Sequence, residues 1–220
     1  MAKKNMCGYT LGEEIFSSVS HGVGALLGIA ALVILIVFAA INGDALDVVA
    51  VSIYGTTLII LYTISTLYHS LTNEKAKKVF KVLDHCSIYL LIAGTFTPMC
   101  LSCMRSLGWK AILLIVLIWL AAILGIVLYA CFPKKLKILH IILYISMGWS
   151  VLFLMKDLIA VLKAVNAMST LYFLLAGGIA YTAGVIFYVF KKVKYFHSVF
   201  HLFVLGASIC HFFAVLLYFV

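Results

Sequence analysis

The stretch KKVKYFHSVFHLFVLGASICHFF, residues 191–213, opens with lysines and continues as an apolar run that contains three histidines. From about residue 197 onward the run is long enough to cross the hydrocarbon core of a bilayer, which takes about 20 helical residues. Ionisable side chains inside such a segment are costly and tend to mark function. The stretch therefore predicts a membrane-spanning helix that carries part of a functional site.

The rest of the chain has the same apolar character. Of its 220 residues, 66% are hydrophobic and 10% are charged, and the mean hydropathy is +1.23; soluble domains are near half apolar and a quarter charged. Sustained strand alternation is absent, and only helices or closed barrels can span lipid. We predict an all-α integral protein of the cell membrane, one domain over residues 1–220. Its seven spans are expected at about 20–41, 47–70, 84–104, 109–131, 136–156, 168–190 and 197–219.

The distribution of lysine and arginine predicts how the bundle is oriented. The N-terminus and the loops after the second, fourth and sixth spans hold twelve of the sixteen basic residues. Basic residues collect in cytoplasmic loops, so we predict a cytoplasmic N-terminus and a C-terminus outside. The same bias explains the net charge of +9 without a nucleic-acid partner. Thr10 followed by Glu13 is a capping-box pattern, which predicts a short interfacial helix over about residues 10–18.

The histidines gather at one depth of this predicted bundle. His197 and His201 are four residues apart, so they share a helix face at a separation of about 6 Å, a spacing that suits two imidazoles on one zinc ion. A pair of this kind is weak evidence alone, because histidine is common at membrane interfaces. Four other histidines lie at the ends of other predicted spans, in the same half of the membrane: His21, His69, His85 and His140. His211 lies deeper.

Three further residues at this depth strengthen the prediction of a metal site. Ser65 and His69 share a face at the end of the second span, and Asp84 opens the third. We predict a Zn2+ site with an open fourth position, as catalytic zinc sites have. Asp84 would hold the metal's water or accept its proton, and Ser65 would orient it. The predicted ligands are His69, His197 and His201.

The other histidines are expected to play lesser parts. His85 and His140 are expected at the interface, and His21 is expected to line the inner mouth of a cavity. His211 is fourteen residues from His197, about 21 Å along the helix axis, which is too far for the same ion. We therefore expect His211 to be a hydrogen-bonded core residue or part of a polar path.

Prolines, glycines and cysteines add smaller expectations. Pro98 removes a backbone donor, so it is expected to bend the third span. Gly177, Gly178 and Gly184 in the sixth span would allow a neighbouring helix to pack closely. Cys100 and Cys103 form a CxxC pair without a second pair, which makes a redox or metal role for them a minor alternative.

Three segments of the chain resemble the hemolysin III family. They are GEEIFSSVSHGVGA (residues 12–25), STLYHS with KVLDHCSIYLLIAGTFTP (65–70 and 81–98) and HSVFHLFVLGASICHFFAV (197–215). This family is the bacterial branch of the progestin and adipoQ receptor group, which includes the adiponectin receptors. The resemblance implies seven helices with the N-terminus inside. One departure is visible, because the family's first motif often has Asn three positions after its Glu, where this chain has Ser17 after Glu14.

The wider superfamily, which takes in alkaline ceramidases, shares a pattern of SxxxH, Asp and HxxxH. In this chain the pattern falls on Ser65, His69, Asp84, His197 and His201. The resemblance thus implies zinc held by the three histidines, with Asp84 and Ser65 near the metal-bound water.

Three functions fit these features. The first is an intramembrane zinc-dependent hydrolase of a lipid amide or ester, ceramidase-like and active in membrane-lipid homeostasis. The second is a lipid sensor or receptor in which zinc is structural and ties two helices together. The third, suggested by the family's name, is a pore-forming cytolysin. The first two imply a membrane lipid or a fatty acyl chain as the ligand.

Overall fold

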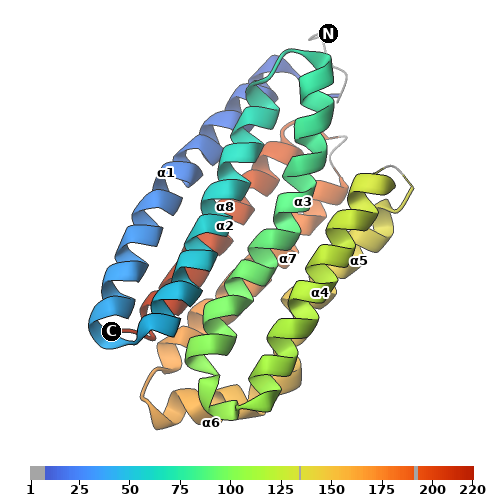
Figure 1. Ribbon diagram of the computed structural model, residues 1–220. Helices are drawn as coiled ribbons and strands as arrows, with labels where there is room; N and C mark the ends of the chain where they lie inside the picture. Colours follow the sequence, from blue (N-terminus) through green and yellow to red (C-terminus); the bar gives the residue numbers. More distant parts are fainter. Residues whose placement is uncertain (1–7, 134, 191–192) are drawn as a thin grey trace.

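The computed structural model describes residues 8–133, 135–190 and 193–220. Within these residues, seven helical stretches are long and apolar enough to cross a membrane, which confirms the predicted all-α, seven-span architecture. Figure 1 shows them running side by side as an elongated bundle with the N-terminus at one end and the C-terminus at the other. The chain is a multi-pass membrane protein. Its orientation stays a prediction, and Lys3, Lys4, Lys134, Lys191 and Lys192, which contributed to it, lie outside the described residues.

Eight α-helices and two of three shorter turns make up these spans in the described residues, and the third turn, η2, follows the third span. The fifth span consists of α5, η3 and α6 in succession. The elements are α1 (Leu11–Asn42), α2 (Ala45–Ser70), α3 (Glu74–Pro98), η1 (Met99–Cys103), η2 (Arg105–Leu107), α4 (Trp109–Cys131), α5 (Lys137–Gly148), η3 (Ser150–Leu154), α6 (Met155–Ala164), α7 (Met168–Val189) and α8 (Phe196–Leu216).

Two predicted boundaries are wrong. The short interfacial helix over residues 10–18 is instead the first part of α1, because no proline interrupts the apolar helix between Leu11 and Asn42. The capping box is present, since the Thr10 side chain accepts from the Glu13 backbone N–H and the Glu13 side chain accepts from that of Thr10. The basic segment before Asp84 is helical, because the Asn73 side chain caps α3 one residue before Glu74.

Pro98 marks the end of regular α-helix in the third span. The chain continues from it as a π-helical turn over Met99–Cys103 and then a 3-10 turn over Arg105–Leu107. A proline cannot donate a backbone hydrogen bond, and π-helical turns are common where the regular hydrogen-bond ladder is broken. Cys100 and Cys103 lie buried in the π-helical turn as free thiols.

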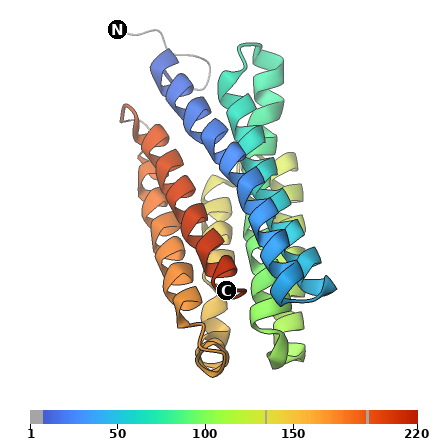
Figure 2. The ribbon, with the colours of Figure 1, turned by 90° about the vertical axis from the view of Figure 1, so that its left-hand side faces the viewer.

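Close helix packing rests on glycines that face bulky residues. α1 packs along α2, α2 along α3, and α7 along α8, while α8 also contacts α1 (Figure 2). A Cβ atom at Gly177 of α7 would lie 2.2 Å from the Cδ2 atom of His211 on α8, and one at Gly184 would lie 3.0 Å from Phe203. These contacts confirm that the glycines of the sixth span permit close packing.

The end of the bundle opposite the N-terminus is held by one guanidinium group. Arg105 donates to Asp44 and to Asp47, with N–O distances of 2.6 Å for both ion pairs. Asp44 is also the N-cap of α2, where its side chain accepts from two backbone N–H groups. The Arg105 guanidinium holds the pKa of the Asp44 carboxyl below its usual range. The α1–α2 turn is thereby tied to the end of the third span.

We expect Arg105→Gln to lower the thermal unfolding midpoint of the purified protein slightly at pH 7. Because the pKa of Asp44 is lower in the folded protein than in the unfolded chain, the ion pair stabilises the fold at pH values above the unfolded-chain pKa of about 3.9. This stabilisation is lost as the pH falls through the pKa of Asp44 in the folded protein. The gap between wild type and variant should therefore close below about pH 4. A gap that stays constant from pH 7 to pH 3 would contradict this assignment.

Candidate metal centre

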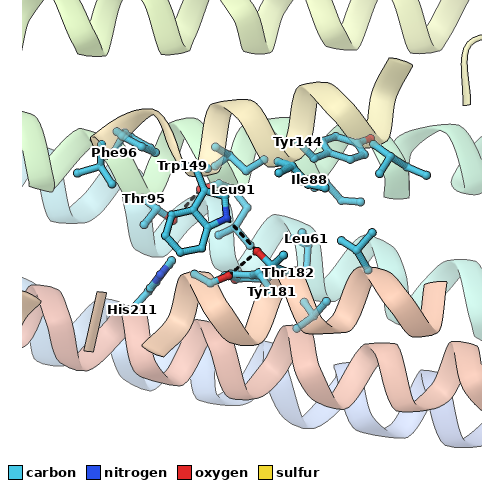
Figure 3. Close-up of a pocket in the computed structure, with 18 of the residues that line it drawn as sticks. Leu61, Ile88, Leu91, Thr95, Phe96, Tyr144, Trp149, Tyr181, Thr182 and His211 are labelled. Atoms are coloured by element: carbon cyan, nitrogen blue, oxygen red, sulfur yellow. Dashed lines mark hydrogen bonds between the residues drawn. The ribbon is translucent and has the colours of Figure 1, made fainter. Parts of the chain in front are cut away.

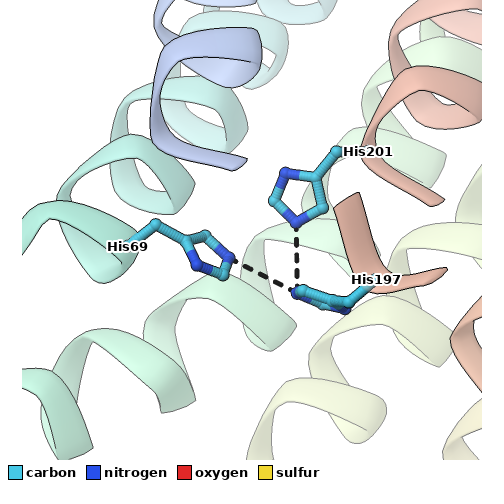
Figure 4. Close-up of side chains that lie close together, drawn as sticks. All are labelled: His69, His197 and His201. Atoms are coloured by element: carbon cyan, nitrogen blue, oxygen red, sulfur yellow. Dashed lines mark hydrogen bonds between the residues drawn. The ribbon is translucent and has the colours of Figure 1, made fainter. Parts of the chain in front are cut away.

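Three histidines from two helices meet inside the N-terminal end of the bundle (Figure 4). His69 lies in the last turn of α2, and His197 and His201 lie in the first turns of α8. The Nε2 atom of His197 is 3.4 Å from Nε2 of His69 and 3.2 Å from Nε2 of His201. One ring nitrogen from each residue lies within 4.8 Å of the others, and all three side chains are buried. This group could hold a metal ion.

Two of the three separations agree with the geometry of a zinc site. Zinc–nitrogen bonds of about 2.0–2.1 Å at tetrahedral angles place two ligand nitrogens about 3.3 Å apart. The two measured Nε2 separations lie on either side of that value. Imidazole also suits other transition metals, so the donor set indicates this class of ion and leaves its identity open.

A buried carboxylate and lysine support the first of these histidines. The Oε2 atom of Glu14 on α1 is 2.5 Å from Nδ1 of His69, and its Oε1 atom is 2.9 Å from Nζ of Lys77 on α3. A carboxylate can only accept here, so Nδ1 of His69 carries the proton and the lone pair of Nε2 points to the other histidines. Three helices thus fix one imidazole.

Glu14 and Lys77 were not among the predicted site residues. The sequence did offer a signal for Glu14, because it is a carboxylate in an otherwise apolar helix, and ionisable residues in such helices tend to mark function. Glu14 also lies in one of the segments that carry the family resemblance. Lys77 gave no such signal, because it belongs to a basic segment that was expected to be a loop.

Asp84 lies close to Ser65 and to one of the three histidines, His69. The Asp84 carboxylate lies near the side chains of Ser65 and His85 and interacts electrostatically with His69. Its Oδ2 atom is 3.3 Å from Nδ1 of His85. The compact set of nitrogens described above consists of histidines alone, so Asp84 stands next to the possible ligands.

The remaining histidines are buried, which corrects the interfacial positions expected for two of them. Nδ1 of His85 is 2.9 Å from the Lys81 carbonyl oxygen, which can only accept, so Nε2 accepts from the Tyr188 hydroxyl at 3.3 Å. Nδ1 of His140 is 2.7 Å from the Tyr89 hydroxyl. Tyrosine partners compensate for the loss of water and make these buried positions tolerable. His21 stacks on His201 with ring centroids 3.8 Å apart, so it packs against the centre itself.

A cavity of about 160 Å3 extends from this region between α3, α5, α7 and α8. His85 and Tyr188 line it near Asp84 and His197. Trp149 and His211 also line it (Figure 3). Most of the other lining residues are apolar. His85 therefore links Asp84 to an internal space suited to a hydrocarbon chain.

The comparisons with known proteins agree with this architecture. A sequence model of the haemolysin-III-related family matches residues 9–212. The chain belongs to the haemolysin-III-related family. The hemolysin-3 homolog of Bacillus subtilis (strain 168) is 43% identical over 210 residues, which cover 96% of each chain. Hemolysin-3 of Bacillus cereus is 44% identical over 207 residues, covering 94% of this chain and 91% of the relative.

A more distant similarity extends to an animal protein. Human monocyte to macrophage differentiation factor is 28% identical over 183 residues, covering 80% of this chain and 72% of the relative. This match agrees with the predicted resemblance to the progestin and adipoQ receptor group. The family assignment made from the three sequence segments is confirmed.

We expect Glu14→Gln to weaken metal binding by about 10- to 100-fold, because the partner of a ligand histidine sets its tautomer and basicity. Metal affinity of the purified protein, measured by competition with a chromogenic chelator, checks this. Glu13→Gln is the matched control, since Glu13 serves the helix cap and contacts the Tyr195 backbone. Equal losses in both variants would show that Glu14 acts only through stability.

Proposed function

We propose that this member of the haemolysin-III-related family is an intramembrane zinc-dependent hydrolase of a lipid amide or ester. The convergence of three buried histidine nitrogens beside a carboxylate and a hydroxyl carries this proposal. Its biological setting would be membrane-lipid homeostasis. The substrate's acyl chain is the expected ligand of the internal cavity.

Zinc is the proposed ion, with His69, His197 and His201 as its protein ligands. Three protein ligands leave a tetrahedral position open, which is typical of catalytic zinc sites, whereas structural sites have four. Zinc at such a centre supplies Lewis acidity, which polarises a carbonyl group and makes water nucleophilic near pH 7. The separations of 3.2 and 3.4 Å between Nε2 atoms support this choice.

Asp84 is the proposed proton acceptor. Its carboxylate can take a proton from an attacking water and return it to the leaving amine or alcohol, as a general base and then a general acid. Ser65 lies near the same carboxylate and would hold it in position. Nδ1 of His85, 3.3 Å from Oδ2 of Asp84, restrains it from the cavity side.

The cavity supports a lipid with a long hydrocarbon chain as substrate. Its lining is largely apolar, so a chain placed there excludes water and gains binding energy from apolar burial. The predicted orientation sets the metal centre near the cytoplasmic face. A substrate whose headgroup lies at that interface would present its carbonyl group at the depth of Asp84.

Two alternatives remain from the same features. In the first, zinc is structural and joins α2 to α8 while a bound lipid shifts the bundle between states. In the second, the protein lyses membranes, which the names of the two Bacillus relatives suggest. Uncharged residues line the cavity, which favours a lipid ligand over a water-filled pore.

Metal content and lipid hydrolysis, measured on the same purified samples, test the proposal. We expect about one zinc per chain in the wild type, retention of zinc in Asp84→Asn and its loss in His197→Ala. Release of fatty acid from ceramide or from phosphatidylethanolamine should fall by at least about 100-fold in both variants, because each loses a part of the catalytic machinery.

The outcomes separate the three functions. Stoichiometric zinc without hydrolysis of any lipid in a broad panel would overturn the hydrolase and favour the sensor. Wild-type protein that conducts ions in planar bilayers, and does so equally in His197→Ala, would favour the cytolysin. Protein free of metal after purification without a chelator would remove both zinc-dependent functions.

A further inference from the structure

Two of the three candidate metal ligands are oriented by side chains of α1. Glu14 holds the His69 ring through Nδ1, and His21 stacks on the His201 ring with centroids 3.8 Å apart. An imidazole ligand must present one nitrogen to the ion at a fixed angle, so a second contact that orients each ring is part of such a site. For His197 the corresponding contact comes from the residue that precedes the cap of α1.

Tyr9 is that residue, and its ring stacks on the ring of His197. The two ring centroids are 4.7 Å apart and the ring planes are inclined by 16°. The rings of Phe200 and Tyr188 lie farther from His197, at 5.9 and 6.4 Å. Tyr9 is buried and also approaches the ring of His69, with centroids 6.1 Å apart. A single buried ring therefore lies beside two candidate ligands that belong to different helices.

The capping box of α1 fixes the position of Tyr9. Thr10 is the N-cap, and its backbone N–H donates to Oε2 of Glu13 at 2.8 Å. Oε1 of the same carboxylate accepts from the backbone N–H of Tyr195 at 2.9 Å. Tyr195 is the N-cap of α8 and stands two residues before His197. One carboxylate therefore joins the start of α1 to the start of α8, and it sets the ring of Tyr9 against the ring of His197.

The place of His197 in its helix explains why this contact matters. Side chains of an α-helix lean toward its N-terminus and rest on the preceding turn. His197 lies in the first turn of α8, so no preceding turn of its own helix supports the ring. Stacked aromatic rings attract each other beyond the effect of the area that they bury. Tyr9 thus supplies the missing support, while Nε2 of His197 stays 3.4 Å from His69 and 3.2 Å from His201.

We propose that Tyr9 is the positioning residue of His197, and that its ring face holds this imidazole in the orientation that a metal ion requires. The role belongs to the face of the ring and not to the hydroxyl group. The inference rests on the metal centre of the proposed function, but it is independent of whether that centre hydrolyses a lipid. It gives the segment before α1 a part in metal binding.

Titration with Co2+ tests this role, because zinc has a filled d shell and gives no visible spectrum, whereas Co2+ absorbs visible light. Full-length protein in nanodiscs is freed of metal with a chelator, the chelator is removed, and Co2+ alone is added. The absorption bands depend on the number and angles of the ligands, so they report the orientation of His197. We expect Tyr9→Phe to keep the wild-type bands and to bind Co2+ within about twofold of the wild type, since its ring offers the same face.

Tyr9→Leu should change both the bands and the affinity. Leucine is apolar but has no flat face, so we expect the bands to shift or lose intensity and the affinity to fall by about three- to tenfold, the effect of one lost stacked pair. The thermal midpoint shows whether this variant is folded, and Tyr9→Met replaces it if it is not. Arg105→Gln is the control for a general loss of stability, because Arg105 lies at the opposite end of the bundle, and it should keep the wild-type bands.

The outcomes separate this inference from the proposed function. Wild-type bands in Tyr9→Leu overturn the inference even if the affinity falls, because the ligands then keep their geometry without the ring. Altered bands in Tyr9→Phe overturn it too, since they assign the effect to the hydroxyl group, and altered bands in Arg105→Gln do so by assigning it to stability. A wild type that binds no Co2+ overturns the metal centre and the inference together. The expected bands without hydrolysis of any lipid would overturn the hydrolase and leave the role of Tyr9 standing.

Discussion

The hydrogen bond from Nδ1 of His69 to Glu14 is the interaction on which the candidate metal centre depends. It sets which nitrogen of His69 is free, and it brings a negative charge from α1 into contact with α2. Lys77 then adds α3 to the same cluster by pairing with the second oxygen of Glu14. A carboxylate and an ammonium group buried together compensate each other's loss of hydration only in such a close arrangement. The first three helices are thereby held in the register that presents His69 to α8.

Much of the fold and part of the site follow from the sequence because they depend on simple periodicities. Apolar runs of membrane-spanning length predict the seven spans, and a separation of four residues predicts that His197 and His201 share a face. The approach of His69 could be expected only from its similar depth in the bilayer. The distances between the three rings arise from helix packing, which periodicity does not describe.

The misplaced elements share a physical cause. Depth in a membrane was inferred from distance to the ends of apolar runs, so polar residues near those ends were expected at the interface. His140 and His85 are instead buried, because tyrosines of the packed helices offer them hydrogen bonds. Lys77 is buried for the same reason, since Glu14 accepts from it. Whether such a residue is buried depends on hydrogen-bonding partners from distant parts of the chain. The sequence of a single helix does not reveal these partners.

Helix α8 shows how one element serves two separate spaces. At about 100° per residue, His197 and His201 point to one side of the helix, whereas Phe200, Val204 and His211 form a stripe about 60° away. Only the stripe lines the cavity, while His201 stacks on His21 of α1. The possible metal ligands and the cavity-lining residues thus lie on neighbouring faces of one helix. His85 lines the cavity and contacts both Asp84 and Tyr188. Under the proposed function, an acyl chain would therefore pass this residue to reach the candidate metal centre.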